Sequence, residues 1–400
     1  MKHSNRNRSD EEDNARLVYS ISKEWPFRLV KVVSFLVIFG AGLVFGLAAS
    51  SHVRYFTSTS ELFFPTFRNP PIQRKNSYVA GERNCGKGEC LDFWTFVEPI
   101  QLNHSMTDEQ LFWRASMLPR QSKYPFKRVP KVAFMFLTRG PLPLSPLWDR
   151  FLKGHEELFS VYVHTLPGYK LDVTEDSAFY GRQIPSQEVW WGSPTLTDGE
   201  RRLLANALLD FSNERFVLLS ESCIPIYDFK TVYKYLIESA ESFVDSYDDP
   251  SRYGRGRYSR SMLPDIRLYQ WRKGSQWFEM SRFLAVNIIS DTKYYTLFRK
   301  YCKPSCYPDE HYIPTYLNMF FGSLNSNRSV TWVDWSRGGP HPATFGGEDI
   351  TEGFIEAIRN NGTECSYNSR QTYMCYLFAR KFAPSALEPL LNLTSSLLKY

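Results

Sequence analysis

The sequence predicts an α/β fold with a mostly parallel central sheet, and three observations support this prediction. Val132–Leu137 and Phe216–Ser220 are continuous apolar runs, as expected of strands that are buried on both faces. Between them, Asp198–Ser212 has the apolar periodicity of an amphipathic helix. Strands and helices that alternate at this spacing predict right-handed βαβ units, with helices covering the sheet.

The remaining elements are predicted in chain order from capping and periodicity. Thr107 to Gln110 form a capping box, which marks the start of a helix. The further predicted helices are Asp108–Met117, Leu147–Leu158 and Phe229–Ala240. The further predicted strands are Ser160–Thr165 and Glu188–Trp191. Ligands of parallel sheets bind where the strands end, which is here at Thr138–Gly140, His164–Thr165, Trp191–Ser193 and Ser220–Cys223.

The N-terminal part of the chain predicts a membrane anchor. Val32–Ala49 carries no charge, and its length just suffices to cross the hydrocarbon layer, with Lys31 extending to the interface. Basic residues are concentrated before this segment, so the positive-inside rule places the N-terminus in the cytosol and the remaining chain in the lumen. Ala48–Ser50 leaves open the alternative of a cleaved signal peptide and a secreted domain, but the long leading segment favours an uncleaved anchor. The predicted segments are a cytoplasmic tail at 1–28, a transmembrane signal-anchor at 29–50, a luminal stem and N-terminal extension at 51–128, and a folded domain at 129–391.

A luminal location gives meaning to two other sequence features. Four Asn-x-Ser/Thr motifs are N-glycosylation candidates, at Asn103, Asn327, Asn361 and Asn392. Disulfides are allowed in this compartment, and six of the seven cysteines lie in close sequence pairs. The simplest pairing is Cys85–Cys90, Cys302–Cys306 and Cys365–Cys375, with Cys223 as a buried free thiol. No Cys-x2-Cys spacing occurs, which weighs against the rival interpretation as a zinc site.

Composition narrows the possible partners. A content of 43% hydrophobic residues in 400 residues is enough for a substantial core. The net charge of +6 is modest and no long Lys/Arg block occurs, so nucleic acid is not expected as a partner. The densest basic cluster is Arg252–Arg260, which is either a flexible solvated loop or a lip that binds anions or sugars.

Cys302–Leu317 contains the strongest candidate for acid–base chemistry. Asp309 and Glu310 stand just before an apolar, aromatic-rich segment that predicts a helix, capped by Asp309 or opened by Pro314. A helix N-terminus favours an ionised carboxylate, and nearby rings partly exclude water, which suits Glu310 to the role of a general base. A simple cap with a solvated charge is the alternative interpretation.

Six segments in collinear order resemble one protein family: KVAFMFLTRGPLPLSPLWDRFLKGH, FVLLSESCIPIYDF, GSQWFEMSR, YPDEHYIPTYL, WVDWSRGGPHPATFG and YLFARKFAP. It is the core-2/I-branching β-1,6-N-acetylglucosaminyltransferase family, and within it the plant brittle-culm-type branch. The resemblance covers roughly Met106–Leu391. It implies a Golgi type II membrane protein with a GT-A-like, Rossmann-type sandwich as catalytic domain. It also implies transfer of a sugar, N-acetylglucosamine or a related one, from a UDP-sugar to a glycan hydroxyl with inversion.

The resemblance assigns expected roles around the reacting atoms. Glu310 matches the catalytic base of the family, and Lys381 matches its phosphate-binding lysine, with Arg380 beside it. A second family cation lies upstream, and Arg337 is the candidate for it. Members of this type work without metal, so no cofactor is expected, although Asp245–Asp249 superficially offers carboxylates for a metal.

Further residues are candidates for substrate binding. On the donor side, His164 stands where relatives have an aspartate that contacts the nucleoside, and Trp191 stands near a nucleoside-contacting aromatic residue; Thr138 and Arg139 are candidates from their position at a strand end. On the acceptor side, Trp332 and Trp335 match an aromatic stretch of the family, and indole rings suit the CH faces of sugars. Ser275 and Trp277 stand in a segment that resembles the family's Gly-Ser-aromatic turn, and Arg260 is a candidate from the basic cluster. Core packing is the alternative role for each tryptophan. The departure at His164 also leaves open a catalytically inactive glycan-binding or scaffold protein of the same fold.

Overall fold

The structure is a computed structural model, and it describes residues 34, 36–42, 97, 102–117, 124–303, 306–360 and 362–400. The chain divides by its contacts into two units, Met1–Asn84 and Cys85–Tyr400. In the first unit, residues 36–42 are helical, and Leu36 to Phe39 are exposed. Within the described ranges, no helix is both long and apolar enough to cross a membrane. Most of the predicted anchor at 29–50 and of the stem at 51–128 lies outside these ranges, as do Cys85 and Cys90.

The central sheet of the second unit has four strands in the order β2-β1-β3-β5. The strands are β1 (Lys131–Leu137), β2 (Phe159–His164), β3 (Asn213–Leu219) and β5 (Glu279–Ser281). β1 pairs in parallel with both β2 and β3, and β5 adds an antiparallel edge. The predicted α/β fold with a mostly parallel sheet is therefore confirmed.

Alternate residues of β1 face two separate hydrophobic cores. Phe134 and Phe136 belong to one buried cluster, whereas Ala133 and Met135 belong to another on the opposite face. Successive side chains of a strand point to opposite faces, so a strand covered on both sides must be apolar at every position. This is the physical origin of the continuous apolar run Val132–Leu137.

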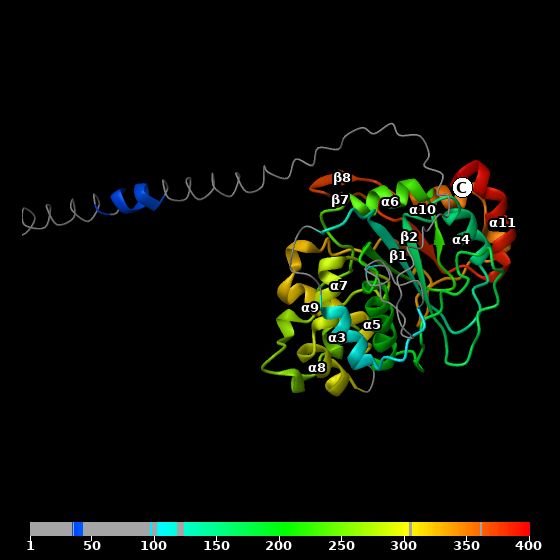
Figure 1. The fold of residues 1–400 in the computed structure, drawn as a ribbon. Coiled ribbons are helices and arrows are strands. Elements are labelled where there is room, and N and C mark those ends of the chain that lie inside the picture. Colours follow the sequence, from blue (N-terminus) through cyan, green and yellow to red (C-terminus); the bar gives the residue numbers. More distant parts are fainter. Residues whose placement is uncertain are drawn as a thin grey trace, which may run out of the picture. The chain divides into compact units, whose positions relative to one another are not determined.

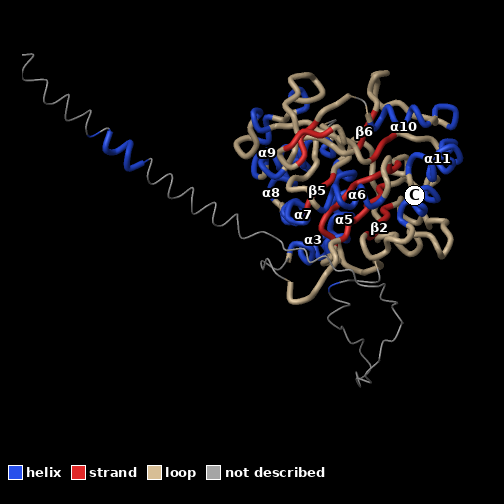
Figure 2. Tube along the Cα trace, turned by 90° about the horizontal axis from the view of Figure 1, so that it is seen from above, coloured by secondary structure: helices blue, strands red, loops and turns tan. Residues whose placement is uncertain are grey.

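Helices cover both faces of the sheet (Figures 1 and 2). One face carries α3 (Asp108–Ser116), α5 (Pro194–Leu208), α7 (Arg282–Ser290), α8 (Lys293–Tyr301) and α9 (Pro308–Phe320). The other face carries α4 (Ser145–Leu152), α6 (Phe229–Ile237), α10 (Glu352–Arg359) and α11 (Leu387–Leu393). At α3 the predicted capping box is confirmed, because Thr107 and Gln110 exchange hydrogen bonds of 3.0 and 3.3 Å.

A small second sheet extends the carboxyl edge of the central one. Its order is β4-β9-β6, formed by β4 (Ile224–Pro225), β9 (Phe378–Arg380) and β6 (Thr331–Val333). The Phe382 N–H donates to the Ser222 carbonyl oxygen at 3.0 Å. The sheet thereby fixes the Arg380-Lys381 segment beside the loop that follows β3. A hairpin of β7 (Cys365–Tyr367) and β8 (Arg370–Thr372) lies nearby in sequence.

The cysteine prediction is confirmed where the structure describes it. Cys302–Cys306 and Cys365–Cys375 are disulfides, and Cys223 is a buried free thiol.

Two predicted elements differ from the structure. Glu188–Trp191 is not a strand, because the Trp190 N–H donates to Thr195 Oγ1 at 2.9 Å and so turns the chain into α5. The predicted helix Leu147–Leu158 ends at Leu152. Leu158 still packs against the core, but from the turn before β2, so its apolar spacing did not require a helix.

Candidate active site

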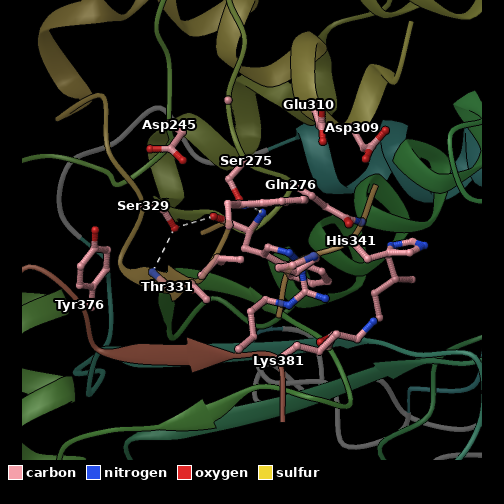
Figure 3. A pocket seen from close by; sticks show the side chains of 18 of the residues that line it. Asp245, Ser275, Gln276, Asp309, Glu310, Ser329, Thr331, His341, Tyr376 and Lys381 are labelled. Atoms are coloured by element: carbon pink, nitrogen blue, oxygen red, sulfur yellow. Dashed lines mark hydrogen bonds between the residues drawn. The ribbon is translucent and has the colours of Figure 1, made fainter. Parts of the chain in front are cut away.

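A cavity of about 740 Å³ lies at the carboxyl ends of β1 and β3. Thr138 and Arg139 reach it from the end of β1, and Ser220 and Glu221 from the end of β3. Figure 3 shows Asp309 and Glu310 entering the cavity from α9 and Lys381 lying across from them. The cavity therefore brings carboxylates and cations from distant parts of the chain into one space.

The start of α9 is set by Pro308, which differs from the prediction. Asp309 does not cap this helix and Pro314 does not open it: Pro308 occupies the first turn, and Tyr307 precedes it with a φ of 54°. Proline suits the first helical position because its missing N–H would have no partner there. Glu310 then lies in the first turn, where the helix dipole favours a negative charge.

Pro314, inside α9, has a different consequence. Because proline has no N–H, the carbonyl oxygen of Glu310 receives no helical hydrogen bond from position 314. It accepts the Gly274 N–H instead, at 2.8 Å. A Cβ at position 274 would lie 2.0 Å from the Asp245 carbonyl oxygen, so only glycine fits there. This contact holds Ser275 beside the catalytic candidate.

Two cations bind one oxygen of the Glu310 carboxylate. Arg257 Nη1 lies 2.7 Å and Lys273 Nζ 3.2 Å from the same atom, Oε2. Both contacts place positive charge against a side chain that is only 26% exposed. Both cations approach closest to Oε2 rather than to the second oxygen, Oε1. This geometry suits an oxygen that takes a proton from a bound hydroxyl.

A buried acid pair lies behind Glu310. Burial, together with the charge of Glu310, raises the pKa of Asp309 to about 7. Burial and Asp309 raise the pKa of Glu200 well above its ordinary value. Gln276 donates to Glu200 Oε1 at 2.9 Å, while Glu200 Oε2 and Asp309 Oδ1 are buried without a hydrogen-bond partner in the described part of the chain. Proton binding by this pair keeps Glu310 from facing two further negative charges.

We expect the stability of the protein to fall as the pH rises through the range set by Asp309. Its pKa is raised from 3.8 to about 7 on folding, so its stabilising contribution is full below about pH 4 and is lost as the pH passes 7. In Asp309→Asn, the slope of unfolding free energy against pH should become shallower by up to about 1.4 kcal/mol per pH unit. Denaturant unfolding of the full chain between pH 5 and 8 measures this slope. The exposed Asp172→Asn is the control, and an unchanged slope in Asp309→Asn would show that Asp309 ionises normally.

A cluster of cations lies across the cavity. Arg380 is partly buried, and its guanidinium carbon lies 4.1 Å from the Trp277 ring centroid. Burial lowers the pKa of Lys381, and the charges of Arg380 and Arg139 lower it further. Cations that disfavour one another in this way are stabilised by an anion placed among them.

A carboxylate cluster that could hold a metal ion does not occur among the residues that the structure describes. Asp245 lines the cavity, whereas Asp248 binds the exposed Arg255 with an Oδ1–Nε distance of 2.8 Å. Asp249 accepts from the Ser251 N–H at 2.8 Å. Asp248 and Asp249 thus have separate partners, and of these three aspartates Asp245 alone lines the cavity.

Comparison with known proteins decides the family. The family model described as "Core-2/I-Branching enzyme" matches residues 132–359, which include β2, β3, β5 and α9. The chain belongs to the core-2/I-branching enzyme family. It is also 36% identical over 309 residues to "Glycosyltransferase BC10" from Oryza sativa subsp. japonica, covering 66% of this chain and 76% of the relative. The expected resemblance to the brittle-culm-type branch is confirmed, and the chain is a glycosyltransferase.

In this core-2/I-branching enzyme, most of the residues predicted for the site line the cavity. These are Glu310, Lys381, Arg380, Trp191, Thr138, Arg139, Trp335, Ser275 and Trp277. Their individual roles stay predictions.

Four predicted residues do not line the cavity. His164 is fully buried, and its Nε2 lies 3.1 Å from Arg202 Nη1 and accepts the Gln187 N–H. Burial, together with Arg202, lowers the pKa of His164 to about 4, so the ring is neutral. Trp332 packs on Phe345 at a centroid distance of 5.9 Å. The other two, Arg260 and Arg337, are exposed to solvent.

Sequence reasoning did not assign four residues at or next to this site. They are Arg257 and Lys273, which bind Glu310, Gln276, which lines the cavity, and Glu200, which interacts with Asp309. The arginine cluster indicated that this segment could belong to the site, because one interpretation of Arg252–Arg260 was a lip that binds anions or sugars. Which arginine reaches Glu310 depends on the backbone of that loop, and it is Arg257 rather than Arg260.

The predicted glycosylation sites are accessible where they are described. Asn103, Asn327 and Asn392 are exposed, and Asn361 lies outside the described residues. Glycosylation at these sites remains a prediction.

Proposed function

We propose that the protein is an inverting, metal-independent glycosyltransferase with Glu310 as the general base. The observation that supports this best is that Glu310 and the Arg380–Lys381 pair line one cavity from different elements (Figure 3). An inverting transfer needs a base at the attacking oxygen and positive charge at the departing diphosphate. Glu310 is the candidate for the base, and the Arg380–Lys381 pair across the cavity is the candidate for the positive charge.

The proposed reaction is a single in-line displacement. The acceptor hydroxyl attacks the anomeric carbon and passes its proton to Glu310 Oε1, which lies opposite the oxygen bound by Arg257 and Lys273. As the new carbon–oxygen bond forms, the bond to the diphosphate breaks and its electron pair leaves with the nucleoside diphosphate. Lys381, Arg380 and Arg139 stabilise the charge that develops on this leaving group.

The proposal also covers the sugar donor, the cellular location of the protein and the fold of its catalytic domain. We infer a UDP-sugar, with N-acetylglucosamine or a related sugar, and a GT-A-like catalytic domain. A signal-anchor at 29–50 would hold this domain in the Golgi lumen as a type II membrane protein. The apolar run Val32–Ala49 and the basic residues before it support this topology.

Release of free UDP from candidate donors tests the proposal. The purified full chain is incubated with a panel of UDP-sugars and mixed plant glycans, with EDTA or with added Mn²⁺. We expect one donor to release UDP at similar rates in both conditions. Turnover that occurs only with Mn²⁺ would contradict metal independence.

A glycan-binding protein without turnover is the second candidate. It is motivated by the buried neutral His164 and by Arg337, which is exposed and does not line the cavity. Binding of UDP and glycan without UDP release from any donor would favour this candidate.

A further inference from the structure

A row of aromatic and cationic side chains leads out of the cavity past Glu310. His341 and Trp191 line the cavity, and their ring centroids are 5.3 Å apart. Trp191 contacts Tyr307 at 5.2 Å, and the Arg257 guanidinium lies 4.1 Å from the Tyr307 ring. Tyr253 follows, 5.7 Å from the same guanidinium. These five residues are called the aromatic–arginine row.

The middle of the row is fixed by backbone geometry. Tyr307 has a φ of 54°, which is uncommon for a residue other than glycine. Gly192 has a φ of +74°, and a Cβ there would lie 3.1 Å from the Tyr307 ring. Arg257 is held by its ion pair with Glu310. The row therefore presents a preformed surface rather than a set of independent side chains.

Two rings of the row, one at the cavity and one at its outer end, are open to solvent. Trp191 is 53% and Tyr253 49% exposed. Exposed rings at the mouth of a sugar-transferring site suit the CH faces of pyranoses. Because Arg257 binds Glu310, a glycan whose hydroxyl reaches the base would extend outwards over Arg257 and Tyr253.

The segment that carries the outer end of the row is rich in arginine. The segment Arg252–Arg260 contains four arginines and no acidic residue. Arg255 binds Asp248 and Arg257 binds Glu310, but within the described part of the chain Arg252 and Arg260 have no carboxylate partner. The guanidinium of Arg252 lies 4.7 Å from the Tyr253 ring, directly at the end of the row.

The loop that carries these arginines is anchored rather than flexible. The Trp271 indole N–H donates to the Gly254 carbonyl oxygen at 3.1 Å, and the Arg255 N–H donates to the Asp249 carbonyl oxygen at 2.8 Å. Trp271 is itself buried in the core. A fixed loop loses less conformational freedom on binding, which favours recognition by its side chains.

We propose that the acceptor is an anionic glycan chain that lies along the aromatic–arginine row, with uronic acid carboxylates bound by Arg252 and Arg260. Arginine is suited to this because its planar guanidinium matches a carboxylate with two parallel hydrogen bonds. The rings of the row contact the sugar faces, so the chain is recognised by shape as well as by charge. This inference rests on the proposed role of Glu310, since the row positions the acceptor only if Glu310, which Arg257 binds, is the base.

Binding of charged and neutral forms of one oligosaccharide tests the proposal. The probes are hexamers of galacturonic acid and of glucuronic acid, each compared with its fully methyl-esterified form, on the full chain by calorimetry. We expect at least one acid to bind about tenfold more tightly than its ester, with a difference that shrinks at high salt. Equal affinities of both acids and their esters would overturn the proposal without any variant being needed.

Variants then show which residues cause the difference in affinity between the acid and its ester. Arg252→Gln with Arg260→Gln should reduce acid binding to the level of the ester and leave ester binding unchanged. Tyr253→Ala should weaken both forms, because stacking does not depend on the carboxylate. Arg114→Gln, at an exposed arginine on α3, is the matched control. An equal loss in Arg114→Gln would show a general charge effect and contradict the proposed site.

Parallel measurement of UDP release separates this inference from the proposed function. Donor turnover with no preference for acidic glycans would overturn the acceptor inference alone. Preference for acidic glycans without turnover from any donor would overturn the proposed function alone.

Discussion

Glu310→Gln is expected to reduce sugar transfer by about a thousandfold, the range in which a positioned general base contributes. Glutamine has nearly the same shape, so the cavity and the donor-binding cations should be preserved. It cannot accept the acceptor proton, and it also leaves Arg257 and Lys273 without the negative charge that they bind. Initial rates and the dissociation constant of UDP, measured on the same preparation, separate chemistry from binding.

Two further variants make the Glu310 result specific. Glu310→Asp keeps the carboxylate on a shorter side chain and should recover part of the lost rate. Glu348→Gln, at an exposed glutamate, should transfer sugar like the unaltered protein. If Glu310→Gln transferred sugar at a rate within tenfold of the unaltered protein, Glu310 would not be the base.

Lys381→Ala is expected to reduce kcat by about a hundredfold. The reason is that a cation placed next to the charge that develops on the leaving group stabilises mainly the transition state. Lys381 lines the cavity beside Arg380, and burial and the neighbouring cations lower its pKa. An anion among these groups relieves their repulsion, and the departing diphosphate carries more charge than the intact donor. Affinity for UDP-sugar should therefore change less than the rate.

The charge itself is tested by a conservative replacement. Lys381→Arg should retain more activity than Lys381→Ala, since it keeps a cation in the cavity. Lys127→Ala, at an exposed lysine, serves as the control. If Lys381→Ala raised KM alone with kcat unchanged, Lys381 would contribute to ground-state binding rather than to leaving-group stabilisation.

The central fold could be predicted because its strands face two cores at once. Such strands have to be apolar at every position, and the intervening helices carry one apolar face, so both leave long patterns in the sequence. The second sheet left no such pattern. β4, β6 and β9 have only two or three residues each, too few for any periodicity to show. The position of Arg380 opposite the end of β3 depends on that sheet.

The site was predictable where a residue's role depends on local sequence or on family resemblance. Glu310 lies in the first turn of a helix, and the acidic, proline-containing sequence at the start of this helix predicts its position. Its ion-pair partners could not be predicted, since Arg257 is 53 residues away and reaches it through a loop whose backbone decides which arginine points inwards. The predictions that His164 and Arg337 line the site were wrong for the same reason. A sequence position near a strand end or a glycine turn does not define where the side chain points.

The hydrogen bond between Gly274 and the carbonyl oxygen freed by Pro314 has a consequence for redesign of this enzyme. This hydrogen bond joins the segment that carries Ser275 and Gln276 at the cavity to the turn that carries Glu310. Exchanging either piece with a relative, in order to alter which sugar is used, would shift the other. A successful chimera would have to carry both segments together, with the glycine and the proline retained.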